Sequence, residues 1–331
     1  MRAPTAEPNF KGSCSVHVGV QALLCGGRPG SSQARPEPKH ISGMRACRPT
    51  FAAVLSVFAA LVLASSAAAS RNAGIAALQV ALHARGYYAG TIDGVNGPGT
   101  SAALRRFQLH AGLPQSGTLT PATRRALGRF GRYSLGSRPL TRGAVGWDVA
   151  ALQFLLAWHG FPSATFDGGL GNHTAKALKR FQRWAGLPAD GVAGPTTFAA
   201  LRKPPARCPV QLAWPVQAPV GEGFGPRGDR FHAGIDLLAG RGTPVQAAAP
   251  GRVAFAAFSR GGWGNLVVVV HRDGVRTMYA HLSKITVRLG QAVATGQQVG
   301  LVGATGDATG PHLHFEVRLR GAAVDPQTAL P

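Results

Sequence analysis

The sequence predicts an α+β multidomain protein in which two small three-helix modules precede a compact antiparallel β domain. Two observations support this fold class, and two more exclude a disordered chain and a disulfide scaffold. A segment with helical periodicity occurs twice, from residue 75 and from residue 149, and from about residue 219 the apolar runs become short and β-branched. Gly and Pro make up about a fifth of the 331 residues, below the share that marks low-complexity disorder. The four cysteines are too few for a disulfide scaffold of this length.

An uncharged segment near the N-terminus indicates export. Residues 49–69 carry no charge, follow two nearby arginines and end in three alanines, which is the pattern of a secretory signal peptide. We therefore expect residues 44–69 to be a signal peptide that begins near Met44, and residues 1–43 to be an upstream extension. A membrane anchor is the alternative, because the segment approaches the roughly 20 residues that a spanning helix needs. Either interpretation places the rest of the chain outside the cytoplasm, secreted or in the cell envelope.

The chain is strongly basic, with 35 Lys and Arg against 13 Asp and Glu, a formal charge of +22. After residue 69 the charge is +17 and only Cys208 remains, so neither an internal disulfide nor a thiolate metal site can form there. A charge of this size on an exported protein predicts a polyanionic partner, such as anionic wall polymers or a phospholipid surface. We expect no nucleic-acid partner, since no nucleic-acid motif occurs.

The repeat aligns residues 75–127 with 149–201 without a gap, and 25 of the 53 positions are identical. Each unit reads as three short helices. In the first unit we expect a helix that Gly86 ends, a second helix capped by Thr100, and a short third helix with Thr123 near its start.

Composition shifts give the domain boundaries. We expect residues 70–130 and 144–202 to be the two modules and residues 219–331 to be the β domain. Residues 131–143 read as a short polar linker. Residues 203–218 read as a second linker, which its prolines make semi-rigid.

The pattern LQ…L…GYY…DG…G..T…L..FQ…GL…G…T…L resembles the peptidoglycan-binding domain of the first type. The resemblance covers about 120 residues as two copies and implies three-helix modules that dock on the glycan-peptide wall. The second copy departs from the first at Pro162 and Gly169, where the first has Tyr88 and Val95. The residues that contact the wall polymer stay unassigned.

The C-terminal region reads as a series of short strands. Asp273-Gly274 lies between two of them and predicts a hairpin turn. The expected strands are residues 251–258, 266–271, 276–282, 298–302 and 312–319.

Two histidines of this region share one strand face. In PHLHFEVRL, strict alternation places His312, His314, Glu316 and Arg318 on one side and the apolar residues on the other. Two adjacent imidazoles suit a divalent metal or proton transfer. A solvated polar face is the alternative.

A second pattern, FHAGIDLLAG, places His232 four residues before Asp236. Its glycines favour a turn into a strand over a helix. Together with the H-x-H pair it offers His, Asp and His as three ligands, and a catalytic zinc site commonly uses three protein ligands plus water. His281, in MYAHLS, exceeds what such a site needs, so its useful role is proton transfer or oxyanion stabilisation.

Residues 221–326 resemble the M23 metallopeptidase domain of the lysostaphin/LytM type, zinc endopeptidases that cut stem or cross-link peptides of peptidoglycan. The matching phrases FHAGIDLLAG, GTPVQAAAPGRV, YAHLS, GQQVGLVGATG and TGPHLHFEVR occur in the family's order. The resemblance implies zinc ligands at His232, Asp236 and His314, a catalytic pair at His281 and His312, and a substrate contact at Asn265. His271 lies in no ligand motif and reads as structural.

The family implication carries an alternative. Some members have lost ligands and act as catalytically silent scaffolds that regulate wall amidases. All five positions are filled here, which favours the enzyme. The sequence leaves open which peptide bond is cut and whether the chain self-associates.

Overall fold

The structure is a computed structural model that describes residues 71–331, all within one structural unit. The predicted signal peptide and upstream extension lie outside the described residues. Within the described part, no helix is both long enough and apolar enough to cross a bilayer.

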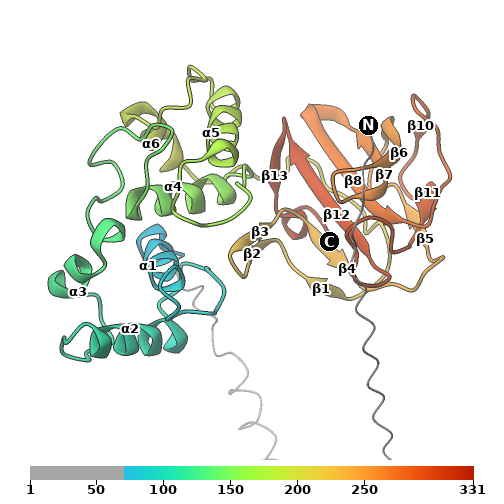
Figure 1. Ribbon diagram of the computed structural model, residues 1–331. Helices are drawn as coiled ribbons and strands as arrows, with labels where there is room; N and C mark the ends of the chain where they lie inside the picture. Colours follow the sequence, from blue (N-terminus) through green and yellow to red (C-terminus); the bar gives the residue numbers. More distant parts are fainter. Residues whose placement is uncertain (1–70) are drawn as a thin grey trace, which may run out of the picture. The chain divides into compact units, whose positions relative to one another are not determined.

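The repeat folds as two three-helix modules, as predicted (Figure 1). The first contains α1 (Ala73–His83), α2 (Pro98–His110) and α3 (Pro121–Ala126), followed by a 3₁₀ turn, Gly128–Phe130. The second contains α4 (Trp147–Trp158), α5 (Asn172–Trp184) and α6 (Pro195–Leu201). The buried cluster around α1 includes Phe154 of α4, so the two modules share apolar contacts.

A buried glutamine organises the first half of each module. The side-chain amide of Gln79 donates to Asp93 Oδ1 (2.7 Å) and Thr100 Oγ1 (3.1 Å), and its oxygen accepts from the Gly94 N–H (2.9 Å). Gln153 makes the same three bonds at the equivalent positions of the second module. These repeated residues therefore connect the turn to the second helix.

The prediction that Thr100 caps the second helix is wrong. That helix begins at Pro98 with Gly97 at its N-cap, and Thr100 lies inside the first turn. Its hydroxyl bonds to Gln79 and to the Val95 carbonyl instead, because the buried glutamine supplies a better-placed partner.

The C-terminal part is antiparallel β structure, as predicted. Its main sheet has the order β1-β4-β12-β8-β7-β6-β10, with β13 paired to β12, while β5-β11-β9 and β2-β3 form two small sheets (Figure 1). The strands are β1 (Val220–Glu222), β2 (Gly225–Arg227), β3 (Arg230–His232), β4 (Ile235–Leu237), β5 (Pro244–Gln246), β6 (Gly251–Ser259), β7 (Gly264–Val270), β8 (Val275–Leu282), β9 (Lys284–Ile285), β10 (Ala292–Val293), β11 (Gln298–Leu301), β12 (Leu313–Leu319) and β13 (Ala322–Val324). Two 3₁₀ turns, Arg272–Gly274 and Pro326–Thr328, complete the domain.

Local sequence explains the centre of this sheet. Asp273 (φ 58°) and Gly274 (φ 74°) both adopt positive φ, the requirement of the tight turn that joins β7 to β8. The fully buried Leu313, Phe315 and Val317 of β12 enter the core, so the alternating histidines emerge on the opposite face.

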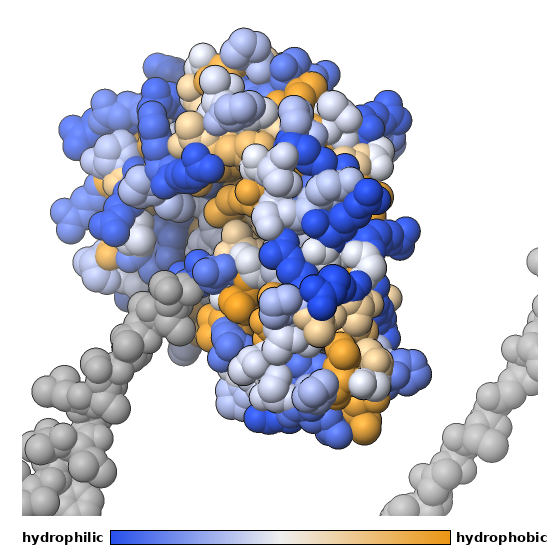
Figure 2. All heavy atoms as spheres, turned by 90° about the vertical axis from the view of Figure 1, so that its left-hand side faces the viewer, coloured by the Kyte–Doolittle hydropathy of each residue, from blue (hydrophilic) through white to orange (hydrophobic). Residues whose placement is uncertain are grey.

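Residues before β1 also pack on this core, where Val210, Leu212 and Val216 are buried. The modules contact the β domain through the backbone: Gly160 O accepts from the Ala323 N–H at 3.1 Å. A Cβ at Gly160 would lie 2.2 Å from Ala323 O, so this approach requires glycine. Figure 2 shows one face of the molecule, where hydrophilic side chains surround separate groups of apolar ones.

Candidate metal centre

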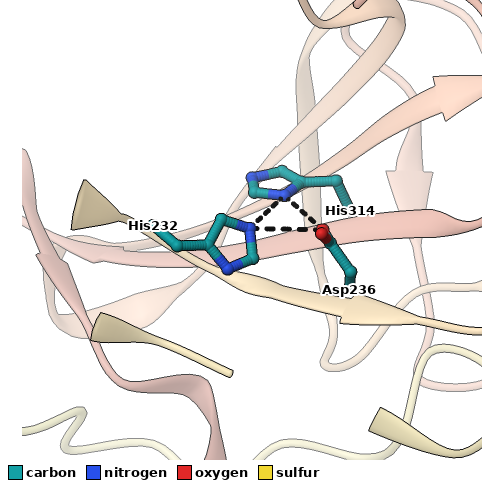
Figure 3. Close-up of side chains that lie close together, drawn as sticks. All are labelled: His232, Asp236 and His314. Atoms are coloured by element: carbon teal, nitrogen blue, oxygen red, sulfur yellow. Dashed lines mark hydrogen bonds and ion pairs between the residues drawn. The ribbon is translucent and has the colours of Figure 1, made fainter. Parts of the chain in front are cut away.

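Three potential metal ligands converge from three strands (Figure 3). His232 ends β3, Asp236 lies in β4, and His314 lies opposite Asp236 on the neighbouring β12. His314 Nδ1 lies 2.8 Å from Asp236 Oδ1 and 3.0 Å from His232 Nε2, and His232 Nε2 lies 3.2 Å from Asp236 Oδ1. All three residues are buried.

The other ring nitrogen of each histidine is already occupied. His232 donates its Nδ1–H to Gly223 O (2.9 Å), and His314 directs Nε2 at Glu316 Oε1 (3.3 Å). The inward nitrogens therefore present lone pairs, and together with the Asp236 oxygen they make three acceptors around one point. Such a cluster needs a positive charge among its atoms, which either a proton on one imidazole or a bound metal ion supplies.

The geometry fits zinc. Two imidazoles and one carboxylate form a donor set that zinc uses, and tetrahedral bonds of about 2.0–2.1 Å put neighbouring ligand atoms about 3.3 Å apart. The separations of 2.8–3.2 Å lie close to that value. Three protein ligands leave a fourth position open.

The metal-free cluster has shifted acidities. Burial alone would raise the pKa of Asp236, but hydrogen bonds and the charges of His232 and His314 lower it far below its usual range. Burial alone would lower the pKa of His314, yet Asp236 and Glu316 raise it to about 9. Without a metal, the surroundings therefore favour an ionised Asp236 beside a protonated His314.

An ion pair between the buried Glu316 and the half-buried Arg318 supports His314 from behind. Glu316 is 1% exposed, and its second oxygen accepts from Arg318 Nε at 2.6 Å. The sequence placed both residues on the face of His314 without assigning them a role. The signal for Glu316 is its position two residues after a ligand on the same strand, and alternation alone does not tell that this position is buried.

Two further histidines stand beside the ligands. The His281 and His312 rings lie 4.8 Å apart between centroids, and the His281 ring lies 5.9 Å from the His314 ring. His281 donates Nδ1–H to Thr305 O (2.8 Å) and His312 donates Nδ1–H to Gly310 O (2.9 Å). Each therefore retains a lone pair on Nε2.

The backbone aims His281 at this site. Simple alternation along β8 would send its side chain to the core with Tyr279. Instead a bulge interrupts the pairing with β7 between Asn265 and Val267, and His281 adopts φ 60° within a strand. Positive φ at a non-glycine residue is strained, and such strain is common at functional sites.

One cavity of about 520 Å³ joins these groups. His232, Asp236, His281, His312 and His314 all line it, together with Trp263. Asn265 is not among its lining residues, and its side-chain amide donates to Leu282 O at 2.9 Å. His271 lies elsewhere, bonded to Pro250 O and Thr277 Oγ1, both at 2.8 Å.

Known families match both parts of the chain. Residues 230–326 match the model of peptidase family M23. Residues 71–127 and 146–201 match the model of a peptidoglycan binding domain.

Individual relatives align with shorter stretches. DD-carboxypeptidase/endopeptidase Mpg of Neisseria gonorrhoeae is 48% identical over 103 residues, which are 31% of this chain and 24% of that protein. Murein hydrolase activator NlpD of Salmonella typhimurium is 31% identical over 175 residues, 51% of this chain and 46% of that protein. This chain thus spans less than half the length of both.

Among solved structures, the catalytic domain of lysostaphin from Staphylococcus simulans is 38% identical, with 33% of this chain and 90% of that chain covered and a TM-score of 0.32. Every one of the clustered histidines and Asp236 falls within residues 230–326. This protein therefore carries a peptidase family M23 domain, preceded by two peptidoglycan binding domains.

Proposed function

We propose that this protein is a zinc-dependent endopeptidase of the cell envelope that binds peptidoglycan and hydrolyses its stem or cross-link peptides. The observation that carries the proposal is the single cavity in which three acceptor atoms converge beside two further imidazoles. Export by the predicted signal peptide, residues 44–69, belongs to the same proposal.

Each side chain receives a role. His232, Asp236 and His314 hold the metal, and zinc bound there supplies Lewis acidity to polarise a peptide carbonyl and a water molecule. Burial lowers the pKa of His281, so its imidazole is neutral near neutral pH and can accept a proton at Nε2.

His281 and His312 divide the remaining work. One takes the proton of the attacking water at Nε2, and the other donates a hydrogen bond to the developing oxyanion or returns a proton to the leaving amine. The bonds to Thr305 O and Gly310 O keep a proton on Nδ1 of both rings, so the ring that takes the water proton does so at Nε2 as a neutral imidazole, and the ring that donates from Nε2 does so as an imidazolium. Asn265 acts as a substrate contact only if its bond to Leu282 O opens.

The helical modules supply binding. Attachment to an insoluble polymer raises the local substrate concentration without any new contact at the active site. The charge of +17 after residue 69 adds salt-sensitive attraction to anionic wall polymers.

A regulatory scaffold is the second candidate, because the relative NlpD is named a murein hydrolase activator. A scaffold needs neither metal ligands nor the imidazole pair. All five positions are filled in this chain, which supports the enzyme.

Zinc content and peptide release test the proposal together. We expect the purified wild type to hold one zinc and to release peptides from sacculi, measured by mass spectrometry. His281→Ala and His312→Ala should keep zinc and lose activity by about 100-fold or more. The matched control is His173→Ala, an exposed histidine of α5.

Two results would contradict it. Zinc-free, chelator-resistant wild type that still cuts peptides would remove the metal mechanism. Sacculus binding and amidase stimulation without peptide release would establish the scaffold instead.

A further inference from the structure

A second cavity adjoins the metal site. It has a volume of about 780 Å³ and shares Trp263 and Arg318 with the cavity that contains the clustered histidines. Its walls come from strands β7, β8 and β12 on one side and from helix α5 on the other. The two cavities therefore lie next to each other along one face of the main sheet, with Trp263 and Arg318 as their common wall.

Arginines dominate this cavity. No Asp or Glu lines it. Five arginines do: Arg180, Arg183, Arg276, Arg318 and Arg320. Arg318 is paired with Glu316, whereas none of the other four forms a salt bridge among residues 71–331. We name these five residues the arginine cleft.

The cleft concentrates like charge at a cost. Arg276 lies directly opposite Arg318 on neighbouring strands, where like charges are destabilising. Burial, and after it the positive charge of the nearby Arg318, lower the pKa of Arg180. Arg180 is therefore a third guanidinium close enough to be repelled by Arg318. An anionic ligand would relieve this repulsion.

The two walls are held together by direct contacts. Arg180 Nη2 donates to Gly321 O at 3.4 Å, and the Gly160–Ala323 backbone bond lies at the same junction. Phe161, Trp184 and Trp263 add aromatic surface between the charges. The cleft thus offers flat apolar faces beside guanidinium groups.

We propose that the arginine cleft binds free carboxylates in the uncut part of the peptidoglycan peptide. This inference rests on the proposed function, since it takes that peptide as the substrate. The guanidinium fork matches a carboxylate with two parallel hydrogen bonds. Because the two cavities share a wall at Trp263 and Arg318, one extended peptide can reach both of them. A peptide seated there touches both α5 and the catalytic sheet, so the second module helps to select the substrate.

Binding to zinc-free full-length protein tests the inference apart from catalysis. The probe is a soluble peptidoglycan peptide with free carboxylates, and the comparison is the same peptide with those groups amidated, both measured by calorimetry. We expect amidation, or the double substitution Arg276→Gln with Arg320→Gln, to weaken binding at least about tenfold. Arg180→Gln should weaken it in the same direction. Arg288→Gln, an exposed arginine of the same domain outside the cleft, should leave binding unchanged.

Distinct outcomes overturn the inference. Equal affinity of the free and amidated peptides, or wild-type affinity in the double variant, would remove the carboxylate role. If the double variant lost binding to a soluble polyglycerol phosphate but still bound the peptide, the cleft would be assigned to phosphate-bearing polymers instead. Because the measurement needs no turnover, an inactive but peptide-binding protein would refute the proposed function while supporting the cleft. Thermal unfolding of each variant confirms that the fold is retained.

Discussion

Replacing Glu316 by Gln tests whether the ion pair behind the metal site sets its affinity. The substitution keeps the shape of the side chain and removes its charge. Glu316 accepts from both Arg318 Nε at 2.6 Å and His314 Nε2 at 3.3 Å. An amide offers one oxygen only, so its NH₂ group must face one of these two donors. One hydrogen bond is lost, and the half-buried Arg318 loses its counter-charge.

The expected effect follows from the role of partners behind metal ligands. Loss of such a partner typically lowers metal affinity by about 10- to 100-fold, or about 1.4–2.7 kcal/mol. The assay is a zinc titration against a fluorescent chelator at constant pH. Asp273→Asn is the matched control, since it makes the same chemical change at an exposed turn residue that tolerates positive φ. Unchanged zinc affinity in Glu316→Gln, or an equal loss in the control, would refute the reasoning.

Two predictions concern stability. Gln79→Leu leaves Asp93, Thr100 and the Gly94 N–H without their buried partner. We expect denaturant unfolding to show that the free energy of unfolding falls by about 3 kcal/mol, against less than about 0.5 kcal/mol for the exposed Gln115→Leu. Similar values for the two variants would contradict the role of the buried bonds. Burial lowers the pKa of both His159 and His271, so below a pH of about 6.5 the unfolded chain binds more protons and stability must rise with pH, by up to about 1.4 kcal/mol per pH unit for each group. Melting temperatures measured from pH 5 to 7.5 should rise in the wild type and rise less steeply in His159→Gln. A wild-type melting temperature that does not change with pH would contradict the role of these two histidines.

Local patterns predicted the elements well, because their period reports which face is buried. The repeat predicted both modules, and Asp273-Gly274 predicted the hairpin, since each signal lies within a few residues of what it specifies. The role of Thr100 was wrong because its partner, Gln79, lies 21 positions away and becomes a neighbour only after folding.

The candidate site divides in the same way. H-x-H on one strand follows from alternation, and the structure places His314 with two residues from other strands. The arginine cleft has no sequence signal, since Arg180 and Arg276 approach one cavity from different domains. His281 is the case in which alternation points to the wrong face, because a bulge of one residue is not visible in the hydrophobic pattern.

The positive φ of His281 allows the backbone strain at the bulge to be measured separately from the loss of the imidazole. At φ 60° a residue with a Cβ costs roughly 1–2 kcal/mol more than glycine. His281→Ala and His281→Gly both lose the imidazole and its bond to Thr305 O, and both leave nearly the same space. The difference between their free energies of unfolding therefore reports the backbone strain alone. Denaturant unfolding should find the Gly variant more stable by about 1 kcal/mol, and both variants should be inactive. An Ala variant as stable as the Gly variant would mean that the strand relaxes without the imidazole. The ring, through Thr305, would then hold the strained backbone in place, rather than the bulge presenting the ring.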